Sequence, residues 1–323
     1  MSVLVSINCI TYNHEKYIRD AIESFIMQKT TFDFEILIGE DCSTDGNRKI
    51  VDEYVSKFPN RIRLITSDNN VGAQNNLLRL FVNSKGKYIA ICEGDDYWID
   101  PYKLQKQVDY MESHSECSFC FHAAEIVQVD KKPTGNIMRR YNNNCISSTE
   151  DIIIRGGGFC PTASLLFPAK LIENLPEFYI NAKTGDYGIQ MILASKGYAF
   201  YIDKIMSAYR TGVPGSWTSQ LLAVSNIETK IIKYYEDDIK LLDNFNKYSD
   251  YKYSNAVEKT KLPKQFRILL LNNKIKELKA TRYKEFYNAL GTKGKIKLHA
   301  RWYFPKTYRL LKAIRYQSTN LEK

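Results

Sequence analysis

The chain has 323 residues and a formal net charge of +10 at pH 7, with 44% hydrophobic and 25% charged residues. This composition is typical of a folded globular protein and excludes an intrinsically disordered or collagen-like chain. The N-terminus has no basic segment, no apolar run is long enough to span a bilayer, and the seven cysteines form an odd number. We therefore expect a cytoplasmic protein with reduced thiols.

Apolar strands alternate with amphipathic helices through the first hundred residues. The connections between them are short, which predicts a doubly wound, largely parallel α/β sheet whose ligands bind at the carboxyl ends of the strands. The predicted strands span residues 3–10, 34–39, 62–66 and 88–92, and the predicted helices span 18–25, 47–58 and 73–81.

After residue 100 the alternation becomes less regular, which predicts a mixed second half of the sheet. Helices are expected over 103–113 and 186–195, and strands over 118–123, 163–167 and 198–202, with a glycine run at 156–158. From residue 219 onward the pattern is polar and helical, and Pro263 is expected to open a basic tail. We predict a Rossmann-like mixed α/β sheet flanked by helices over residues 1–218, followed by a helical C-terminal region over 219–323.

Three carboxylates follow the strand predicted at 88–92, namely Glu93, Asp95 and Asp96. Carboxylates this close repel one another unless a cation lies between them. Oxygen ligands on a tight loop suit Mg²⁺ or Mn²⁺, ions that also bind substrate phosphates. A solvated acidic turn explains the composition equally well, but the position directly after a buried strand favours the metal site.

A second polar loop follows the strand predicted at 34–39. Glu40 and Asp41 can accept hydrogen bonds from a nucleobase or a ribose hydroxyl, whereas Ser43, Thr44 and Asp45 are typical helix N-caps. We assign Asp41 to a nucleotide and expect Asp45 to cap the following helix.

Three segments, VSINCITYNHEKYI, EILIGEDCSTDG and YIAICEGDDYW followed by DPYKLQKQ, resemble as an ordered set the nucleotide-sugar half of the family 2 glycosyltransferases. These are inverting enzymes of the GT-A fold. The resemblance covers residues 3 to about 107 and continues more weakly to about 218. It implies that Thr11 and Tyr12, with Asn13 after them, flank the base of the donor, and that Asp41 accepts a hydrogen bond from a uracil-type ring.

The resemblance also implies that Glu93 and Asp95 form the Asp-x-Asp motif, with Asp95 as the main ligand of Mg²⁺ or Mn²⁺. Glu93 stands where the first Asp is usual. An inverting transfer needs a general base, and the resemblance implies that this base lies at a helix start about ninety residues after the motif, where the chain has Asp186. Capping of that helix is the alternative role for Asp186. Gly185 replaces the acidic residue that often precedes the base.

Residues 209–218 resemble the flexible loop that closes over the diphosphate in this family. Arg210 would stabilise the leaving group, and Ser216 and Trp217 would cover the site. A surface salt bridge is the alternative role for Arg210. Gly212 stands where relatives often carry a His, so we assign no His ligand and leave the remaining metal positions to phosphate and water. The glycine-rich segment 155–162 is interpreted as the acceptor-side loop.

The positive charge is concentrated at the end of the chain, where residues 264–323 contain sixteen Lys and Arg against three Glu. Within this tail, residues 293–315 mix basic side chains with Trp, Tyr and Leu at nearly helical spacing. This pattern favours a helix on an anionic membrane surface, and a helix that packs on the protein core fits equally well. Nucleic-acid binding is disfavoured because no recognisable module accompanies the charge.

The leading hypothesis is an inverting glycosyltransferase that moves a sugar from a nucleoside diphosphate donor, by preference UDP, to a hydroxyl group. The acceptor would be a lipid-linked or polymeric bacterial surface glycan at the inner face of the cell membrane. A sugar nucleotidyltransferase is the second hypothesis, although it would need a glycine-rich basic loop after the first strand. A non-catalytic adaptor for membranes or nucleic acids on the same fold is the third.

Overall fold

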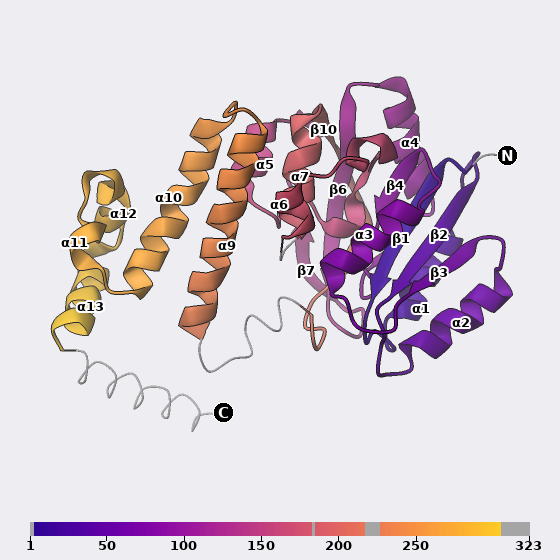
Figure 1. Cartoon of the computed structure of the whole chain (residues 1–323), viewed down its shortest axis with the longest axis horizontal. Coiled ribbons are helices and arrows are strands. Elements are labelled where there is room, and N and C mark those ends of the chain that lie inside the picture. Colours follow the sequence, from indigo (N-terminus) through magenta and orange to yellow (C-terminus); the bar gives the residue numbers. More distant parts are fainter. Residues whose placement is uncertain (1–2, 183–184, 217–226, 305–323) are drawn as a thin grey trace. The chain divides into compact units, whose positions relative to one another are not determined.

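The computed structural model describes residues 3–182, 185–216 and 227–304 (Figure 1). The chain divides into two compact units. The first contains residues 1–220 and 244–256, and the second contains residues 221–243 and 257–323. The first unit is built around a β-sheet, whereas the described residues of the second form helices and the turns between them.

The N-terminal half of the first unit alternates strands and helices as predicted, with ends that differ by at most two residues. The strands β1, β2 and β4 have buried apolar runs and the helices have apolar faces, which is why the sequence pattern located them. The elements are β1 (Val5–Thr11), α1 (Ile18–Ile26), β2 (Phe34–Glu40), α2 (Asn47–Lys57), β3 (Ile62–Thr66), α3 (Ala73–Asn83), β4 (Tyr88–Ile91), the short β5 (Tyr97–Trp98) and α4 (Lys103–Ser113).

The second half of the first unit is less regular. The predicted strand at 163–167 is wrong at its start, because Thr162–Ser164 form a 3-10 turn that leaves only a short strand after it. The predicted strand at 198–202 extends much further, to Arg210. The elements are β6 (Cys117–Val127), β7 (Pro133–Met138), β8 (Cys145–Ser147), α5 (Thr149–Arg155), β9 (Leu166–Pro168), α6 (Glu177–Ile180), α7 (Gly185–Ser195) and β10 (Tyr198–Arg210).

The strands form one mixed sheet in the order β3-β2-β1-β4-β9-β6-β10-β5, with β7 paired to β6 and β8 paired to β10. The first four strands in this order run parallel, and the antiparallel β9 joins them to the parallel pair β6 and β10. The mixed α/β sheet is therefore confirmed, while the largely parallel arrangement holds for β3, β2, β1 and β4. The carboxyl ends of these four strands meet at one edge of the sheet, which gathers the loops after β1, β2 and β4.

Helices cover both faces of the parallel part of this sheet, as expected for strands that are buried on both sides. Alternate residues of β1, among them Val5 and Ile7, join a core with the apolar faces of α1, α2 and α4. On the opposite face α3 contacts β1 and β2, and Phe81 of α3 packs edge-on against Phe167, with ring centroids 6.1 Å apart.

The described helices that contribute to the second unit are α9 (Ile227–Tyr248), α10 (Ser254–Leu271), α11 (Ile275–Leu278), α12 (Lys284–Ala289) and α13 (Gly291–Tyr303). The core of this unit is small and contains Phe266, Leu278 and Leu298. Pro263 does not mark a break but lies inside α10. Next to it, Lys264 is ion-paired with Asp238 of α9 at 2.6 Å, a contact that helps to hold the helix despite the hydrogen bond that proline cannot make.

Candidate active site

The loops after β1 and β2 are held together by hydrogen bonds between their polar side chains. Thr11 at the end of β1 donates from Oγ1 to Asn47 Oδ1 at 2.9 Å. Asn13 has a left-handed backbone conformation with φ of 55°, which Asn tolerates better than most residues. Its N–H donates to Ser43 Oγ at 3.0 Å, and its Oδ1 accepts from the Thr44 N–H at 2.8 Å.

The neighbouring Tyr12 has a 42% exposed side chain. Its ring is therefore open to a flat ligand at the edge where the strands end. Asp45, which we expected to cap α2, accepts from the N–H of Asn47 at 3.0 Å, at the first position of that helix.

Glu40 and Asp41, the two carboxylates assigned to the nucleotide, are almost fully buried. Glu40 Oε1 accepts from the Ser43 N–H at 2.9 Å. The two oxygens of Asp41 accept from the N–H groups of Val71 and Gly72, each at 2.9 Å. Because each carboxylate oxygen can accept a second hydrogen bond, Asp41 can hold this loop and still take a donor from a base. Its role toward a nucleotide stays a prediction.

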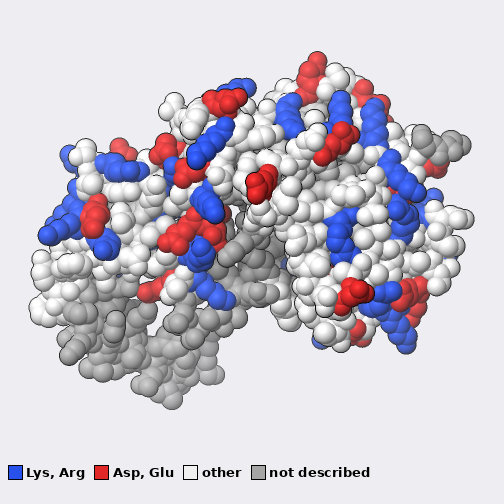
Figure 2. All heavy atoms as spheres, in the orientation of Figure 1, with Lys and Arg blue, Asp and Glu red and all other residues white. Residues whose placement is uncertain are grey.

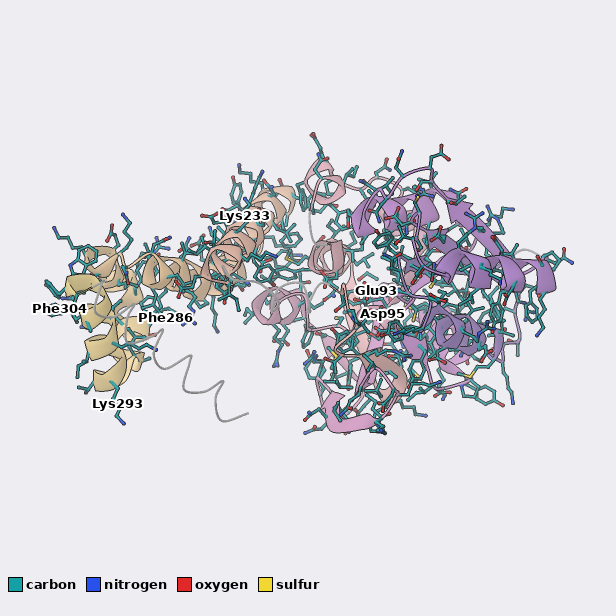
Figure 3. All side chains as sticks on the ribbon, turned by 90° about the horizontal axis from the view of Figure 1, so that it is seen from below. Glu93, Asp95, Lys233, Phe286, Lys293 and Phe304 are labelled. Carbon is teal, nitrogen blue, oxygen red and sulfur yellow. The ribbon has the colours of Figure 1, made fainter. Side chains whose placement is uncertain are left out.

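The acidic loop that follows β4 presses against the loop after β1. The N–H of Gly94 donates to the carbonyl of Ile10 at 2.9 Å. A Cβ at position 94 would lie 2.8 Å from Thr11 Oγ1 and 3.0 Å from His14 Nδ1, closer than real Cβ contacts. Only glycine fits there, and this contact holds the acidic loop against the loop after β1. Glu93 and Asp95 of the acidic loop are labelled in Figure 3.

The carboxylates of the acidic loop disturb one another's titration. Burial, followed by the charges of Asp95 and Asp186, raises the pKa of Glu93 to about 8. Burial and the charges of Asp95 and Glu93 also raise the pKa of Asp96 well above its usual value, even though Asp96 Oδ1 accepts from the Arg210 N–H at 2.8 Å. A divalent cation would reverse this repulsion, so the chemistry of the donor set fits Mg²⁺ or Mn²⁺.

The residues that the structure describes contain no cluster of three His, Cys, Asp or Glu side chains able to hold a metal ion. An ion at the acidic loop would therefore need oxygen atoms from a bound diphosphate or from water, as Mg²⁺ sites commonly do.

Asp186 lies in the first turn of α7, exposed to solvent, with its Oδ1 accepting from the N–H of Tyr187 at 2.8 Å. Its charge contributes to the raised pKa of Glu93, so the structure brings this distant residue close to the acidic loop. A Cβ on Gly157 would lie 3.5 Å from Asp186 Oδ2. The glycine run interpreted as an acceptor-side loop is therefore next to the predicted base.

The position before Asp186 has no room for a side chain. A Cβ on Gly185 would lie 2.0 Å from Oε1 of Gln74, which comes from the start of α3. The Nε2 of Gln74 donates to the carbonyl of Tyr179 at 2.9 Å. The Gln74 carboxamide thus occupies the space beside Gly185.

Arg210 ends β10 and is 3% exposed. Its guanidinium donates to the carbonyls of Asp95 and Val129 and to Asp20 Oδ2, each at 2.8 Å. Burial opposes ionisation of Asp20, but the hydrogen bonds from Lys131 and Arg210 hold the pKa of Asp20 below its usual value. The ion pair of Arg210 is therefore buried behind the acidic loop and is not a surface salt bridge.

The segment after Arg210 is only partly described. The N–H of Ser216 donates to the carbonyl of Val213 at 3.2 Å in the turn that follows β10. Trp217 lies outside the described residues, so its expected role as a cover of the site stays a prediction.

Sequence reasoning missed two residues that the structure places at the site. Asn47, at the start of α2, bonds to Thr11 and donates to Glu40 Oε1 at 3.3 Å. His14 has its Nε2 3.9 Å from Asp95 Oδ2, and burial is the main cause that lowers the pKa of His14. Both lie beside predicted residues along the chain, but no pattern in the sequence marks them as different from ordinary polar residues of a loop.

The family model described as glycosyl transferase family 2 matches residues 6–167 of this chain. Among curated proteins, the putative teichuronic acid biosynthesis glycosyltransferase TuaG of Bacillus subtilis is 34% identical over 130 residues, which are 40% of this chain and 50% of that protein. The chain spans between 36% and 52% of the length of the curated relatives that it matches.

Two solved structures share the fold along most of the chain. The crystal structure of Staphylococcus aureus TarS 1–349 in complex with UDP superimposes with a TM-score of 0.54 and 15% identity, covering 93% of this chain and 91% of that one. The mannosyltransferase PcManGT from Pyrobaculum calidifontis, in complex with GDP-Man and Mn²⁺, gives a TM-score of 0.52 and 13% identity, covering 95% and 88%. At such low identity these likenesses show the fold alone, and they confirm the expected GT-A fold.

No helix formed by the described residues is both long and apolar enough to cross a membrane.

Proposed function

The chain belongs to glycosyl transferase family 2, and from that premise we propose that it is an inverting, metal-dependent transferase of a sugar from a nucleoside diphosphate. The catalytic domain is proposed to span residues 1–218. UDP is the proposed nucleotide, because the exposed ring of Tyr12 can stack on a base and the carboxylate of Asp41 can accept from the N–H of a uracil-type ring. Thr11, Asn13 and Glu40 support this by holding the two loops in place.

The observation that carries the proposal is that the carboxylate of Asp186 lies close enough to the acidic loop to influence the pKa of Glu93. Burial is the main cause that raises the pKa of Glu93, and the charges of Asp95 and then Asp186 add to it, although Asp186 comes from a helix some ninety residues further along the chain. An inverting transfer needs charge stabilisation at the departing diphosphate and a base at the attacking hydroxyl. This arrangement supplies a metal-binding carboxylate, Asp95, close to an exposed carboxylate, Asp186, that can take the proton of the acceptor.

A bound Mg²⁺ or Mn²⁺ would neutralise the charge of the leaving diphosphate. Asp95 is the proposed main ligand, Glu93 contributes to the same site, and phosphate and water fill the positions that protein side chains leave open. The raised pKa values of Glu93 and Asp96 support this role, because an acidic loop that is strained without a cation is suited to bind one.

We assign Arg210 a positioning role in place of direct contact with the diphosphate. Its guanidinium donates to the carbonyl of Asp95, and its backbone N–H donates to Asp96. It therefore fixes the acidic loop from behind, while Asp20 balances its charge. Ser216 and Trp217, further along, remain the proposed cover over the donor.

The acceptor is proposed to be a hydroxyl of a lipid-linked or polymeric surface glycan. The name of TuaG refers to teichuronic acid biosynthesis, and a match to half of that protein supports an acceptor of this general class. Because such acceptors are held at membranes, we further propose that residues 219–323 include a surface for anionic lipid at the inner face of the cell membrane.

The described end of this region supports the membrane proposal. On α13, Ile296 is 62% exposed, and Tyr303 and Phe304 are each 66% exposed. A groove of about 420 Å³ runs along this apolar face, and Lys293 lies near the start of the helix (Figure 3). Lys and Arg side chains are spread over the second unit (Figure 2). Aromatic and basic side chains together suit an anionic interface.

Vesicle sedimentation tests the membrane proposal. The wild type should bind vesicles of phosphatidylglycerol more strongly than vesicles of phosphatidylcholine, and Lys293→Glu and Phe304→Ser should each weaken this binding. Lys233→Glu is the matched control, because it changes the same charge on α9, where Lys233 is ion-paired with Asp237 at 3.2 Å. An equal loss of vesicle binding in Lys233→Glu would show that binding depends on the net charge alone. If the wild type binds no vesicles, the proposal of a membrane-binding surface is refuted.

Calorimetry with UDP and with GDP, each with and without Mn²⁺, tests the donor site. The wild type should bind UDP in a metal-dependent way, and Asp95→Asn should lose that dependence. Asp109→Asn, an exposed position on α4, is the matched control and should bind like the wild type. Failure of the wild type to bind any nucleoside diphosphate would refute the transferase function.

A further inference from the structure

One histidine lies against the acidic loop, and the proposed reaction leaves it without a function. His14 Nε2 is 3.9 Å from Asp95 Oδ2, and the two side chains are only 16% and 15% exposed. Nδ1 of the same ring is buried, and no hydrogen-bond partner for it exists among the residues that the structure describes. The other ring nitrogen, Nε2, is the one that faces Asp95 and is the atom that could bind an ion there.

The backbone holds His14 in this place. Its carbonyl accepts from the N–H groups of Tyr17 and Ile18, both at 2.8 Å, where α1 begins. Its ring also contacts the acidic loop, since a Cβ on Gly94 would lie 3.0 Å from Nδ1. The backbone of His14 is therefore fixed at the helix start, and its ring packs against Gly94 of the acidic loop.

The separation of the two side chains suits a shared ion better than a direct bond. A distance of 3.9 Å is too long for a hydrogen bond. Two neighbouring ligands of an octahedral ion, with bonds of about 2.1 Å at a right angle, lie about 3.0 Å apart. The oxygen of Asp95 and the nitrogen of His14, now 3.9 Å apart, would need to approach by about 1 Å to share such an ion.

We propose that His14 is a nitrogen ligand of the divalent ion that Asp95 binds, an inference that rests on the proposed metal-dependent transfer. A nitrogen ligand has a consequence for ion selectivity. Mg²⁺ favours oxygen ligands, whereas affinity for a mixed nitrogen and oxygen site rises from Mn²⁺ to Co²⁺ in the transition series. His14 thus gives the site a preference for Mn²⁺ and Co²⁺ over Mg²⁺.

Pulsed electron paramagnetic resonance of bound Mn²⁺, with UDP present, tests the ligand directly. Wild type should show nitrogen modulation typical of a coordinated imidazole, and growth on ¹⁵N-histidine should change that signal without any substitution. His14→Gln should abolish the modulation and lower Mn²⁺ affinity roughly 10-fold or more, with a much smaller change for Mg²⁺. His114→Gln is the matched control, because His114 is exposed at the end of α4 and stacks on Tyr110.

The outcomes separate this inference from the proposed function. Mn²⁺ bound to the wild type without nitrogen modulation would overturn the role of His14 and leave the metal-dependent transfer intact. Modulation that survives in His14→Gln would do the same, because it would come from another histidine. Failure of the wild type to bind Mn²⁺ with UDP would overturn both.

Discussion

Removal of one negative charge from the acidic loop should stabilise the protein in the absence of metal. Burial and two neighbouring carboxylates raise the pKa of Glu93 from 4.5 to about 8. A group whose pKa is higher in the folded state favours folding at low pH and opposes it as pH rises through the folded value. Glu93→Gln removes that opposition, so its advantage over the wild type should appear above about pH 5 and stop growing near pH 8.

The size of the effect follows from the shift. One pKa unit corresponds to about 1.4 kcal/mol. Because the side chain of Glu93 is partly exposed to solvent, screening by water lowers the stability change to roughly 1 kcal/mol per pH unit. Between about pH 5 and pH 8 the advantage of Glu93→Gln should therefore reach on the order of 3 kcal/mol. The same substitution should weaken Mn²⁺-dependent binding of UDP, since a carboxylate of the metal site is lost.

Urea denaturation without metal, at several pH values between 5 and 8, measures this advantage. Glu112→Gln is the matched control, because Glu112 is exposed and paired with Lys87 at 2.7 Å, which lowers the pKa of Glu112. That variant should gain no stability as pH rises. A constant difference between wild type and Glu93→Gln across this range would refute the repulsion argument, and so would an equal trend in the control.

Four further changes, one of them paired with a control substitution, have outcomes set by the structure. Asp186→Asn should leave Mn²⁺-dependent UDP binding within about twofold of wild type and reduce the transfer rate by roughly 10²–10⁴; an equal loss of binding in calorimetry would contradict a base role. Gly94→Ala should lower UDP affinity and cost about 1–3 kcal/mol in denaturation experiments, because its Cβ would meet Thr11 Oγ1 at 2.8 Å. Gly158→Ala has open space around the new Cβ and should melt like wild type. Arg210→Lys should lower stability by about 2–4 kcal/mol, since it strips hydrogen bonds from a buried ion pair; a loss below about 0.5 kcal/mol would indicate a surface role. Lys103→Met should raise the melting temperature at pH 7, because burial lowers the pKa of Lys103 to about 7, and this gain should shrink as pH rises toward about 10.

The sequence predicts the parallel part of the fold well because local patterns determine it. Strands such as Phe34–Glu40 contain an apolar run, here at residues 36–38, and helices such as Ile18–Ile26 have one apolar face. Once those strands are parallel, the loops at their carboxyl ends must gather at one edge, so the closeness of residues 11–13, 40–41 and 93–96 follows from topology.

Contacts between residues far apart in the sequence could not be predicted from local sequence patterns. Arg210 pairs with Asp20, 190 positions earlier, and no local pattern records which of many carboxylates meets a buried guanidinium. The approach of His14 to Asp95 depends on Gly94 having no side chain. Pro263 was expected to open the basic tail but lies within α10, because contacts of the neighbouring residues with α9 outweigh its low helix propensity.

The position of α3 connects the two substrates of the proposed reaction. Asp41 accepts a hydrogen bond from the N–H of Gly72, which directly precedes α3. Gln74, in the first turn of that helix, lies against Gly185, which is next to Asp186. A nucleotide that binds to Asp41 and restricts its movement therefore also restricts the N-terminal end of α3, which borders Asp186. Linkage between sites is reciprocal, so a donor that improves acceptor binding must itself be bound more tightly once the acceptor is present. The factor by which UDP raises the affinity for an acceptor should then equal the factor by which that acceptor raises the affinity for UDP, which calorimetry of each ligand with and without the other can check.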